Sequence, residues 1–122
     1  MCLVLTNFLN KISEYCFNGC SQLTEIILPN TIKELGHNAF SSCRKLESID
    51  LANIEKIDYS AFISCVSLKD VYIPNSVEYI GYDAFDNCSN INILCEAESK
   101  PEAWDNDWAG NSSPFVSWGI VK

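Results

Sequence analysis

Four phenylalanines recur along this chain at intervals of 23, 22 and 23 residues, and a repeat of this length leaves few architectures open. A cysteine follows each phenylalanine by three residues, and a leucine or isoleucine follows each cysteine by three more. The three columns are Phe17, Phe40, Phe62 and Phe85; Cys20, Cys43, Cys65 and Cys88; and Leu23, Leu46, Leu68 and Ile91. Periods of about 20–50 residues are typical of solenoids. We therefore predict that successive units stack and that equivalent side chains share one interior column.

Each unit carries two apolar patterns that indicate its local structure. Ile26 and Leu28 alternate with polar or exposed positions, which is typical of a short strand. A second apolar pair follows, and the segment from Gly36 to Phe40 then has the spacing of a short helical turn. The predicted coil is a strand, a turn, a short helical segment and a return. The four predicted coils span residues 1–23, 24–46, 47–68 and 69–91.

The second coil resembles the BspA-like, treponemal-type leucine-rich repeat. The fourth coil matches the same pattern equally well, and the first and third match it with losses at the proline and glycine positions. The residues that carry the resemblance are Leu23, Ile26, Leu28, Pro29, Asn30, Ile32, Leu35, Gly36, Ala39, Phe40, Cys43 and Leu46. The resemblance implies an α/β leucine-rich-repeat solenoid of four 22–23-residue coils, with a parallel β-sheet on one face and an aromatic C-terminal cap.

The family is associated with bacterial cell-surface and secreted proteins, many of them described as adhesins. It implies a protein-binding or adhesion-type module that belongs to a surface or secreted protein and is not an enzyme. The alternative is a purely structural segment of a larger solenoid with no ligand of its own. The N-terminus shows no basic region and no small-residue cleavage site, so we predict no signal peptide, and a cytosolic chain stays open.

The charge balance excludes several classes of partner. Acidic residues outnumber basic ones 16 to 8, which gives a formal net charge of -8. Such a chain repels phosphate backbones and anionic lipid surfaces, so we predict no nucleic-acid partner. No apolar run approaches the ~20 residues of a membrane-spanning helix, so we predict no membrane insertion. The predicted partner is a protein.

The sequence offers no positioned pair of catalytic side chains. His37 is the single histidine, and equivalent positions in the other coils hold Glu14, Tyr59 and Tyr82. We interpret this variety as a solvated convex surface. Because acid–base and nucleophilic catalysis need a positioned pair, we predict no catalytic residue, no metal site and no cofactor.

Seven cysteines occur without a CxxC pair. The repeated column places four of them between inward phenylalanines and leucines, which predicts buried free thiols that pack as small apolar groups. Cys16 replaces an alanine of the other coils and reads as a packing substitution. Cys2 and Cys95 are predicted to face solvent.

The two ends of the solenoid look different. Residues 92–122 are predicted to form a final strand and an aromatic cap built from Trp104, Trp108 and Trp118 with Phe115. An open solenoid end exposes an apolar cross-section that such a cap covers. No comparable cap precedes the first coil, so we predict self-association or continuation into further repeats through this N-terminal end.

The outward positions of the strands are the predicted ligand face. Two columns should alternate with the core: Val4, Ile27, Asp50, Tyr72 and Cys95 in one, and Cys2, Glu25, Ser48, Asp70 and Ile93 in the other. Residue identity changes from coil to coil here, as a recognition surface requires. The candidate binding residues are Ile27, Asp50, Asp70 and Tyr72, with Tyr72 and its acidic neighbours suited to a basic partner.

Overall fold

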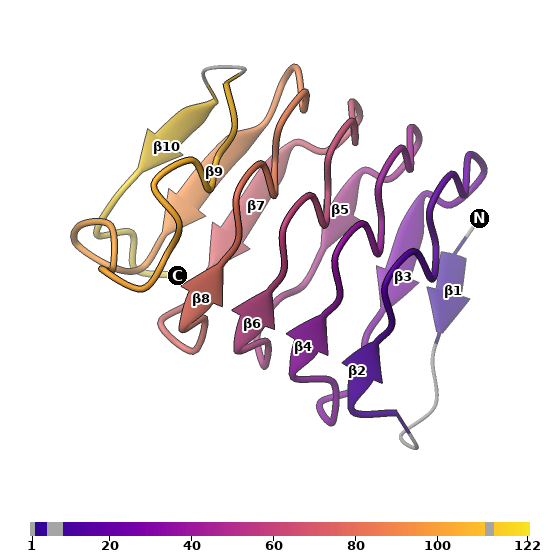
Figure 1. The fold of residues 1–122 in the computed structure, drawn as a ribbon, viewed down its shortest axis with the longest axis horizontal. Helices are drawn as coiled ribbons and strands as arrows, with labels where there is room; N and C mark the ends of the chain where they lie inside the picture. Colours follow the sequence, from indigo (N-terminus) through magenta and orange to yellow (C-terminus); the bar gives the residue numbers. More distant parts are fainter. Residues whose placement is uncertain (1, 5–8, 112–113) are drawn as a thin grey trace.

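The computed structural model describes the backbone of residues 2–4 and residues 9–111 and 114–122 in full. Its described residues form short strands joined by turns, which wind around a single core (Figure 1). The strands are β1 (Cys2–Val4), β2 (Lys11–Ile12), β3 (Glu25–Ile27), β4 (Glu34–Leu35), β5 (Ser48–Ile49), β6 (Lys56–Ile57), β7 (Asp70–Ile73), β8 (Tyr79–Ile80), β9 (Asn92–Cys95) and β10 (Phe115–Ser117).

The strands pair in parallel on two sides of the core. One side carries the sheet β2-β4-β6-β8, and the other carries the sheets β1-β3-β5 and β7-β9-β10. Each pass around the core contributes one strand to each side, so β1, β3, β5, β7 and β9 begin about five turns. The prediction of four coils with a sheet on one face was therefore too small in both respects. Because β9 continues the register of β7, the domain boundary predicted at residue 92 stays a prediction.

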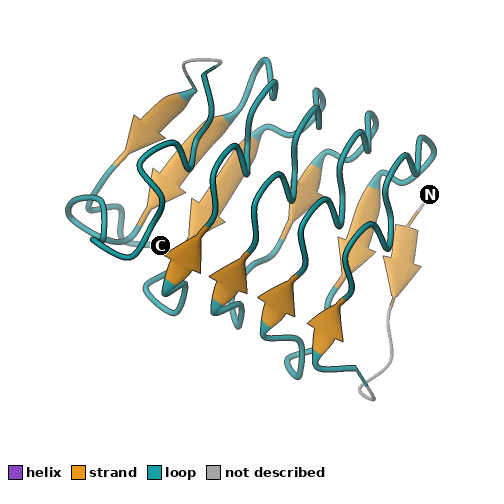
Figure 2. Ribbon diagram, viewed as in Figure 1, coloured by secondary structure: helices purple, strands orange, loops and turns teal. Residues whose placement is uncertain are grey.

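The predicted helical segments are wrong for the described residues, which contain turns in these places (Figure 2). Two residues of the second coil, Asn38 and Ser42, have φ angles of 57° and 58°, and a right-handed helix cannot pass through such positions. The amide of Phe40 is also donated to the next coil, at 2.8 Å from the carbonyl oxygen of Ala61. The spacing resembled a helical turn, but the peptide groups bond between coils. The α/β label is therefore incorrect.

The predicted phenylalanine column is confirmed. The rings of Phe17, Phe40, Phe62 and Phe85 stack with centroid separations of 5.3, 5.4 and 5.3 Å and interplanar angles of 12° or less. The three inner rings are fully buried. Trp108 closes this column edge-on against Phe85 at 6.3 Å. Because each coil supplies one ring, the core exists only where coils stack.

The other cap rings follow the prediction with one exception. Trp104 and Trp108 are buried, and Trp118 packs against the core from a half-buried position. Their rings contact one another at centroid distances of 5.0 and 6.0 Å. Phe115 instead lies on β10 with 79% of its surface exposed, so its predicted place in the cap is wrong.

The buried thiol column is confirmed for its three inner members. The thiols of Cys43, Cys65 and Cys88 donate to the carbonyl oxygens of the phenylalanines one coil earlier, at 3.1, 2.9 and 3.1 Å. Each buried sulfur therefore has a polar partner. Cys20 is half-buried, because the coil before it in the stack is missing from its outer side.

Three cysteines at the ends of the stack behave differently. Cys95 was predicted to face solvent, but it is fully buried, so this prediction is wrong. Cys16 is exposed although its equivalent Ala39 is buried, because the first coil has core packing on one side only. The side chain of Cys2 lies outside the described residues.

Thiol labelling should separate these groups. In a Cys2→Ser variant we expect Cys16 to react with an aromatic disulfide reagent within seconds and Cys20 more slowly. Cys43, Cys65, Cys88 and Cys95 should react only after denaturation, because buried thiols are protonated and inaccessible. Counting released chromophore before and after adding denaturant measures the two groups. More than two fast thiols in the native protein would contradict the buried column.

Candidate binding faces

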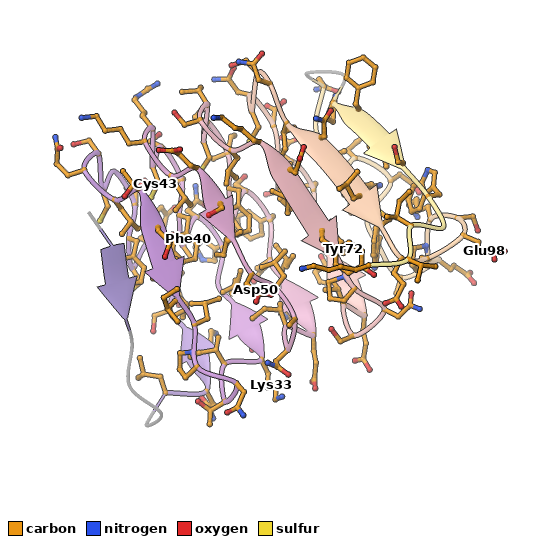
Figure 3. All side chains as sticks on the ribbon, turned by 180° about the vertical axis from the view of Figure 1, so that it is seen from behind. Lys33, Phe40, Cys43, Asp50, Tyr72 and Glu98 are labelled. Carbon is orange, nitrogen blue, oxygen red and sulfur yellow. The ribbon has the colours of Figure 1, made fainter. Side chains whose placement is uncertain are left out.

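The predicted ligand face is the outer side of β3, β5, β7 and β9. Alternation along β7 turns Val71 and Ile73 into the core, whereas Asp70 is exposed and Tyr72 is half-buried on the outside. On β3, Ile27 projects outward with 46% of its surface exposed. Asp50 follows β5 directly and is also exposed; Figure 3 shows it on the same side of the molecule as Tyr72. The side chains of Val4 and Cys2 lie outside the described residues.

The two predicted columns are wrong at the last strand. Asp70 pairs with Asn92, and Tyr72 pairs with Leu94, so the step from β7 to β9 is 22 residues. The sequence analysis used a step of 23 and therefore assigned Ile93 and Cys95 to the outside, where both are in fact buried. A slip of one residue moves every side chain of a strand to the opposite face.

The polar side chains of this face are already engaged within the chain. The amide of Asn92 donates to the carboxylate of Asp70 at 3.0 Å. The carboxylate of Asp50 accepts the backbone N–H of Ala52 at 3.0 Å and holds the turn after β5. These two carboxylates are thus fixed in position while remaining exposed.

The C-terminal tail covers part of Tyr72. The phenol donates to the carbonyl oxygen of Ile120 at 3.3 Å, and the ammonium of Lys122 lies 5.1 Å from the ring centroid. The tail is anchored nearby, because the N–H groups of Gly119 and Ile120 donate to the carbonyl oxygens of Ala97 and Cys95. The sequence showed no sign of this contact, since the tail has no repeat pattern to place it.

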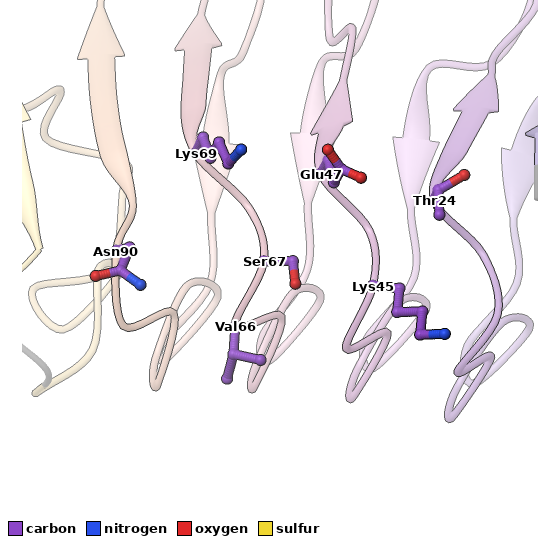
Figure 4. A pocket seen from close by; sticks show the side chains of 7 residues that line it. All are labelled: Thr24, Lys45, Glu47, Val66, Ser67, Lys69 and Asn90. Carbon is purple, nitrogen blue, oxygen red and sulfur yellow. The ribbon is translucent and has the colours of Figure 1, made fainter.

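An open hollow of about 410 Å³ lies where the turns enter β3, β5, β7 and β9 (Figure 4). Its walls are mostly polar and carry charges of both signs, including Lys45, Lys69 and Glu47. The Lys45 ammonium donates to Gln22 Oε1 at 3.4 Å, and the Ser67 hydroxyl donates to the Arg44 carbonyl at 2.6 Å. The remaining lining residues are Thr24, Val66 and Asn90. The hollow is an extension of the outer face, not an enclosed site.

A second row of aromatic rings, which sequence analysis missed, lies on the opposite side of the core. His37 stacks on Tyr59 at 4.6 Å, and Tyr59 stacks on Tyr82 at 4.9 Å. Tyr15 meets His37 edge-on at 5.1 Å. The signal was present in the sequence: three equivalent positions hold aromatic rings, which we interpreted as the variety of an unconstrained surface.

The described residues contain no cluster of three or more histidine, cysteine or acidic side chains able to hold a metal ion. Within the same residues, no helix has the length and apolar character needed to cross a bilayer.

Comparison with known proteins identifies the repeat. The model of the BspA type leucine-rich repeat region matches residues 2–100 in six copies. The chain belongs to this family. No curated protein matches the sequence significantly. The resemblance carried by the second and fourth coils is therefore confirmed over most of the chain.

Solved structures support the same assignment. A leucine-rich repeat protein from Bacteroides ovatus is 31% identical over 99% of this chain, with a TM-score of 0.82. A Treponema pallidum leucine-rich repeat protein is 28% identical over 76% of the chain, with a TM-score of 0.60. A leucine-rich cell surface protein from Faecalibacterium prausnitzii shares the fold, with 24% identity over 90% of the chain and a TM-score of 0.58. The chain spans 30%, 57% and 35% of these three proteins.

The N-terminal end of the stack has no covering coil among the described residues. Leu9 is exposed, and Phe17 is only half-buried although its counterparts are fully buried. Self-association or continuation through this end stays a prediction.

Proposed function

We propose that this BspA-type chain is a protein-binding module of the adhesion type within a surface or secreted protein. The observation that carries the proposal is the contrast between the two sides of each strand. Inward positions repeat from coil to coil, whereas the outward positions change from Ile27 to Asp50 to Tyr72. A regular scaffold with a varied, fixed outer face suits recognition of a protein. The Faecalibacterium relative, described as a cell surface protein, supports the surface location.

The proposed contact residues are Ile27, Asp50, Asp70 and Tyr72. Ile27 supplies exposed apolar area, and the two carboxylates supply negative charge that favours a basic partner. Tyr72 adds an amphipathic ring of the kind enriched in protein interfaces. A binding role, rather than catalysis, fits a face whose polar groups hold one another without forming a nucleophile–base pair.

One observation favours the alternative of a purely structural segment. The tail residues Ile120 and Lys122 already contact Tyr72, so part of the face is occupied by the chain itself. In that case the outer face would serve mainly to hold the tail and close the solenoid.

A pull-down against a panel of purified extracellular proteins distinguishes the two functions. We expect one partner to bind the wild type, and binding to fall about tenfold or more in Tyr72→Ala plus Asp70→Ala, since a tyrosine anchor and its charged neighbour are both lost. The matched control is Tyr79→Ala plus Glu78→Ala, which removes the same residue types from β8 and the position before it. Equal losses in both variants, or no partner at all, would favour the structural segment.

A further inference from the structure

Four aromatic rings form a continuous row on the surface of the solenoid, which we call the aromatic ladder: Tyr15, His37, Tyr59 and Tyr82. The end rings are prominent, with 54% of Tyr15 and 47% of Tyr82 exposed. The two inner contacts are nearly parallel, with interplanar angles of 5° and 3°. Exposed large apolar groups that line up in this way across several repeats are a feature of interaction surfaces.

The aromatic ladder is separate from the face that holds Tyr72. Its members follow β2, β4, β6 and β8 by two or three residues, so they extend the outer surface of that sheet. The strands β3, β5, β7 and β9 lie on the other side of the core (Figure 1). A ligand on the ladder would therefore leave the outer face of β7 free.

The stacking limits what the ladder can bind. His37 and Tyr59 bury their ring faces against their neighbours, so a flat sugar ring finds few open faces on which to stack. The ring edges and phenol oxygens point away from this stack. Among the described residues, no hydrogen bond uses the hydroxyl of Tyr59 or of Tyr82. These oxygens can accept hydrogen bonds from ammonium or guanidinium groups.

Carboxylates flank the aromatic ladder. Asp58 precedes Tyr59 and accepts its backbone N–H at 2.8 Å, which fixes the carboxylate beside the ring. Burial raises the pKa of Tyr59, and Asp58 and Glu14 are among the nearby groups that raise it further. Negative charge therefore surrounds the middle of the ladder, and a cation placed there would be stabilised.

The Tyr82 end is more acidic still. Burial raises the pKa of the Asp83 carboxyl, and the neighbouring carboxylates of Asp86, Asp107 and Asp105 raise it further. On the other end, Lys11 lies 3.8 Å from Glu14 and 3.7 Å from Glu34, so its charge is already balanced. The potential along the ladder consequently favours positive side chains.

The chain itself pairs cations with tyrosines in two other places. The ammonium of Lys56 lies 5.7 Å from the ring centroid of Tyr79, next to the ladder on β8. The ammonium of Lys122 lies 5.1 Å from the ring of Tyr72. These separations are within the range at which a ring attracts a cation.

We propose that the aromatic ladder, with Glu14, Asp58 and Asp83 beside it, is a second recognition surface that binds an arginine- or lysine-rich segment of a protein partner. Guanidinium and ammonium groups donate to the phenol oxygens and pair with the carboxylates, while the aliphatic parts of the basic side chains lie on the ring edges. The outer rings of Tyr15 and Tyr82 offer the most area for stacking.

The test measures binding of a fluorescent hepta-arginine peptide by anisotropy at low salt. The key variant is Asp58→Asn plus Asp83→Asn, which removes two charges and keeps the side-chain oxygens. Asn also tolerates the φ of 55° at position 83. We expect saturable binding to the wild type, weakened about tenfold in this variant. Added salt at about 0.5 M should weaken it further, because exposed charges are screened. Tyr82→Ser should also weaken binding.

The matched control is Asp50→Asn plus Asp70→Asn, which makes the same change in net charge on the other face. Binding to this control should stay within about twofold of the wild type, and amide chemical shifts of the wild type should move at the ladder residues on adding peptide. Equal weakening in both variants would show that the peptide reads net charge alone and would overturn the proposal. Absence of saturable peptide binding, or binding of an uncharged hexasaccharide in its place, would overturn it as well. Because the outer-face variants are separate, failure here is distinguishable from failure of the proposed function.

Discussion

Phe62→Ala is expected to lower the free energy of unfolding by about 3–5 kcal/mol, which is the cost of truncating a buried aromatic ring and leaving a cavity. Phe62 is fully buried and stacks on both Phe40 and Phe85, so neighbouring coils cannot close over the space. A domain of this size is stable by about 5–15 kcal/mol, so the change is a large part of the total. Urea unfolding followed by circular dichroism measures the difference.

The control for this prediction lies in the same column. Phe17 stacks only on Phe40 and is half-buried, because nothing described covers its other side. Phe17→Ala should therefore cost about 1–2 kcal/mol, since less apolar area is lost. If the two variants were destabilised equally, the ring column would not be the shared core that the stacking indicates.

The repeat determined which elements of the fold could be predicted from sequence. Phe40, Cys43 and Leu46 lie at the spacing of the family pattern, and each is buried as the period requires. The period does not state how the peptide groups between them are bonded. The turn from Gly36 to Phe40 satisfies its amides partly across coils, so an apparent helical spacing produced no helix.

The errors in the candidate site have a different origin. The step from β7 to β9 is 22 residues, and this one-residue change moved Cys95 and Ile93 from the predicted outside to the core. Beyond the last coil the tail has no periodicity, so its contact with Tyr72 could not be read from the sequence. The regular part of the chain was thus predictable by alignment of its units, and the irregular part required coordinates.

The aromatic ladder shows the limit of reading one position at a time. His37 alone looks like a solvent-facing residue, and Tyr59 and Tyr82 look like unrelated choices at the same position. Stacking places these rings within 5 Å of one another and turns them into one surface. In a solenoid, a column of similar side chains has consequences even when each member is only partly exposed.

Raising the pH from 8 to 11 is expected to lower the free energy of unfolding by roughly 5 kcal/mol through two thiols alone. Burial raises the pKa of Cys88 and of Cys95 from 9.0 to about 12. In the unfolded chain both thiols ionise above pH 9, whereas in the folded chain they keep their protons until about pH 12. Their contribution to stability is complete below pH 9 and is lost as the pH rises toward 12. At pH 11 the difference is about two pH units, or ~2.7 kcal/mol, for each thiol.

Urea unfolding at pH 8, 9, 10 and 11 in the presence of a reductant measures this dependence. The contact with the Cys43 thiol, together with burial, raises the pKa of Cys65 in the same direction, so the full effect of the column exceeds that of two thiols. Cys88→Ala plus Cys95→Ala is the control, because alanine fills the same inward positions without a proton to lose. Its stability should fall much less between pH 9 and pH 11. The same slope in the wild type and this variant would show that tyrosine or lysine ionisation, not the buried thiols, sets the alkaline limit. Loss of stability below pH 8 would contradict the direction of the shift, since neither thiol ionises there in either state.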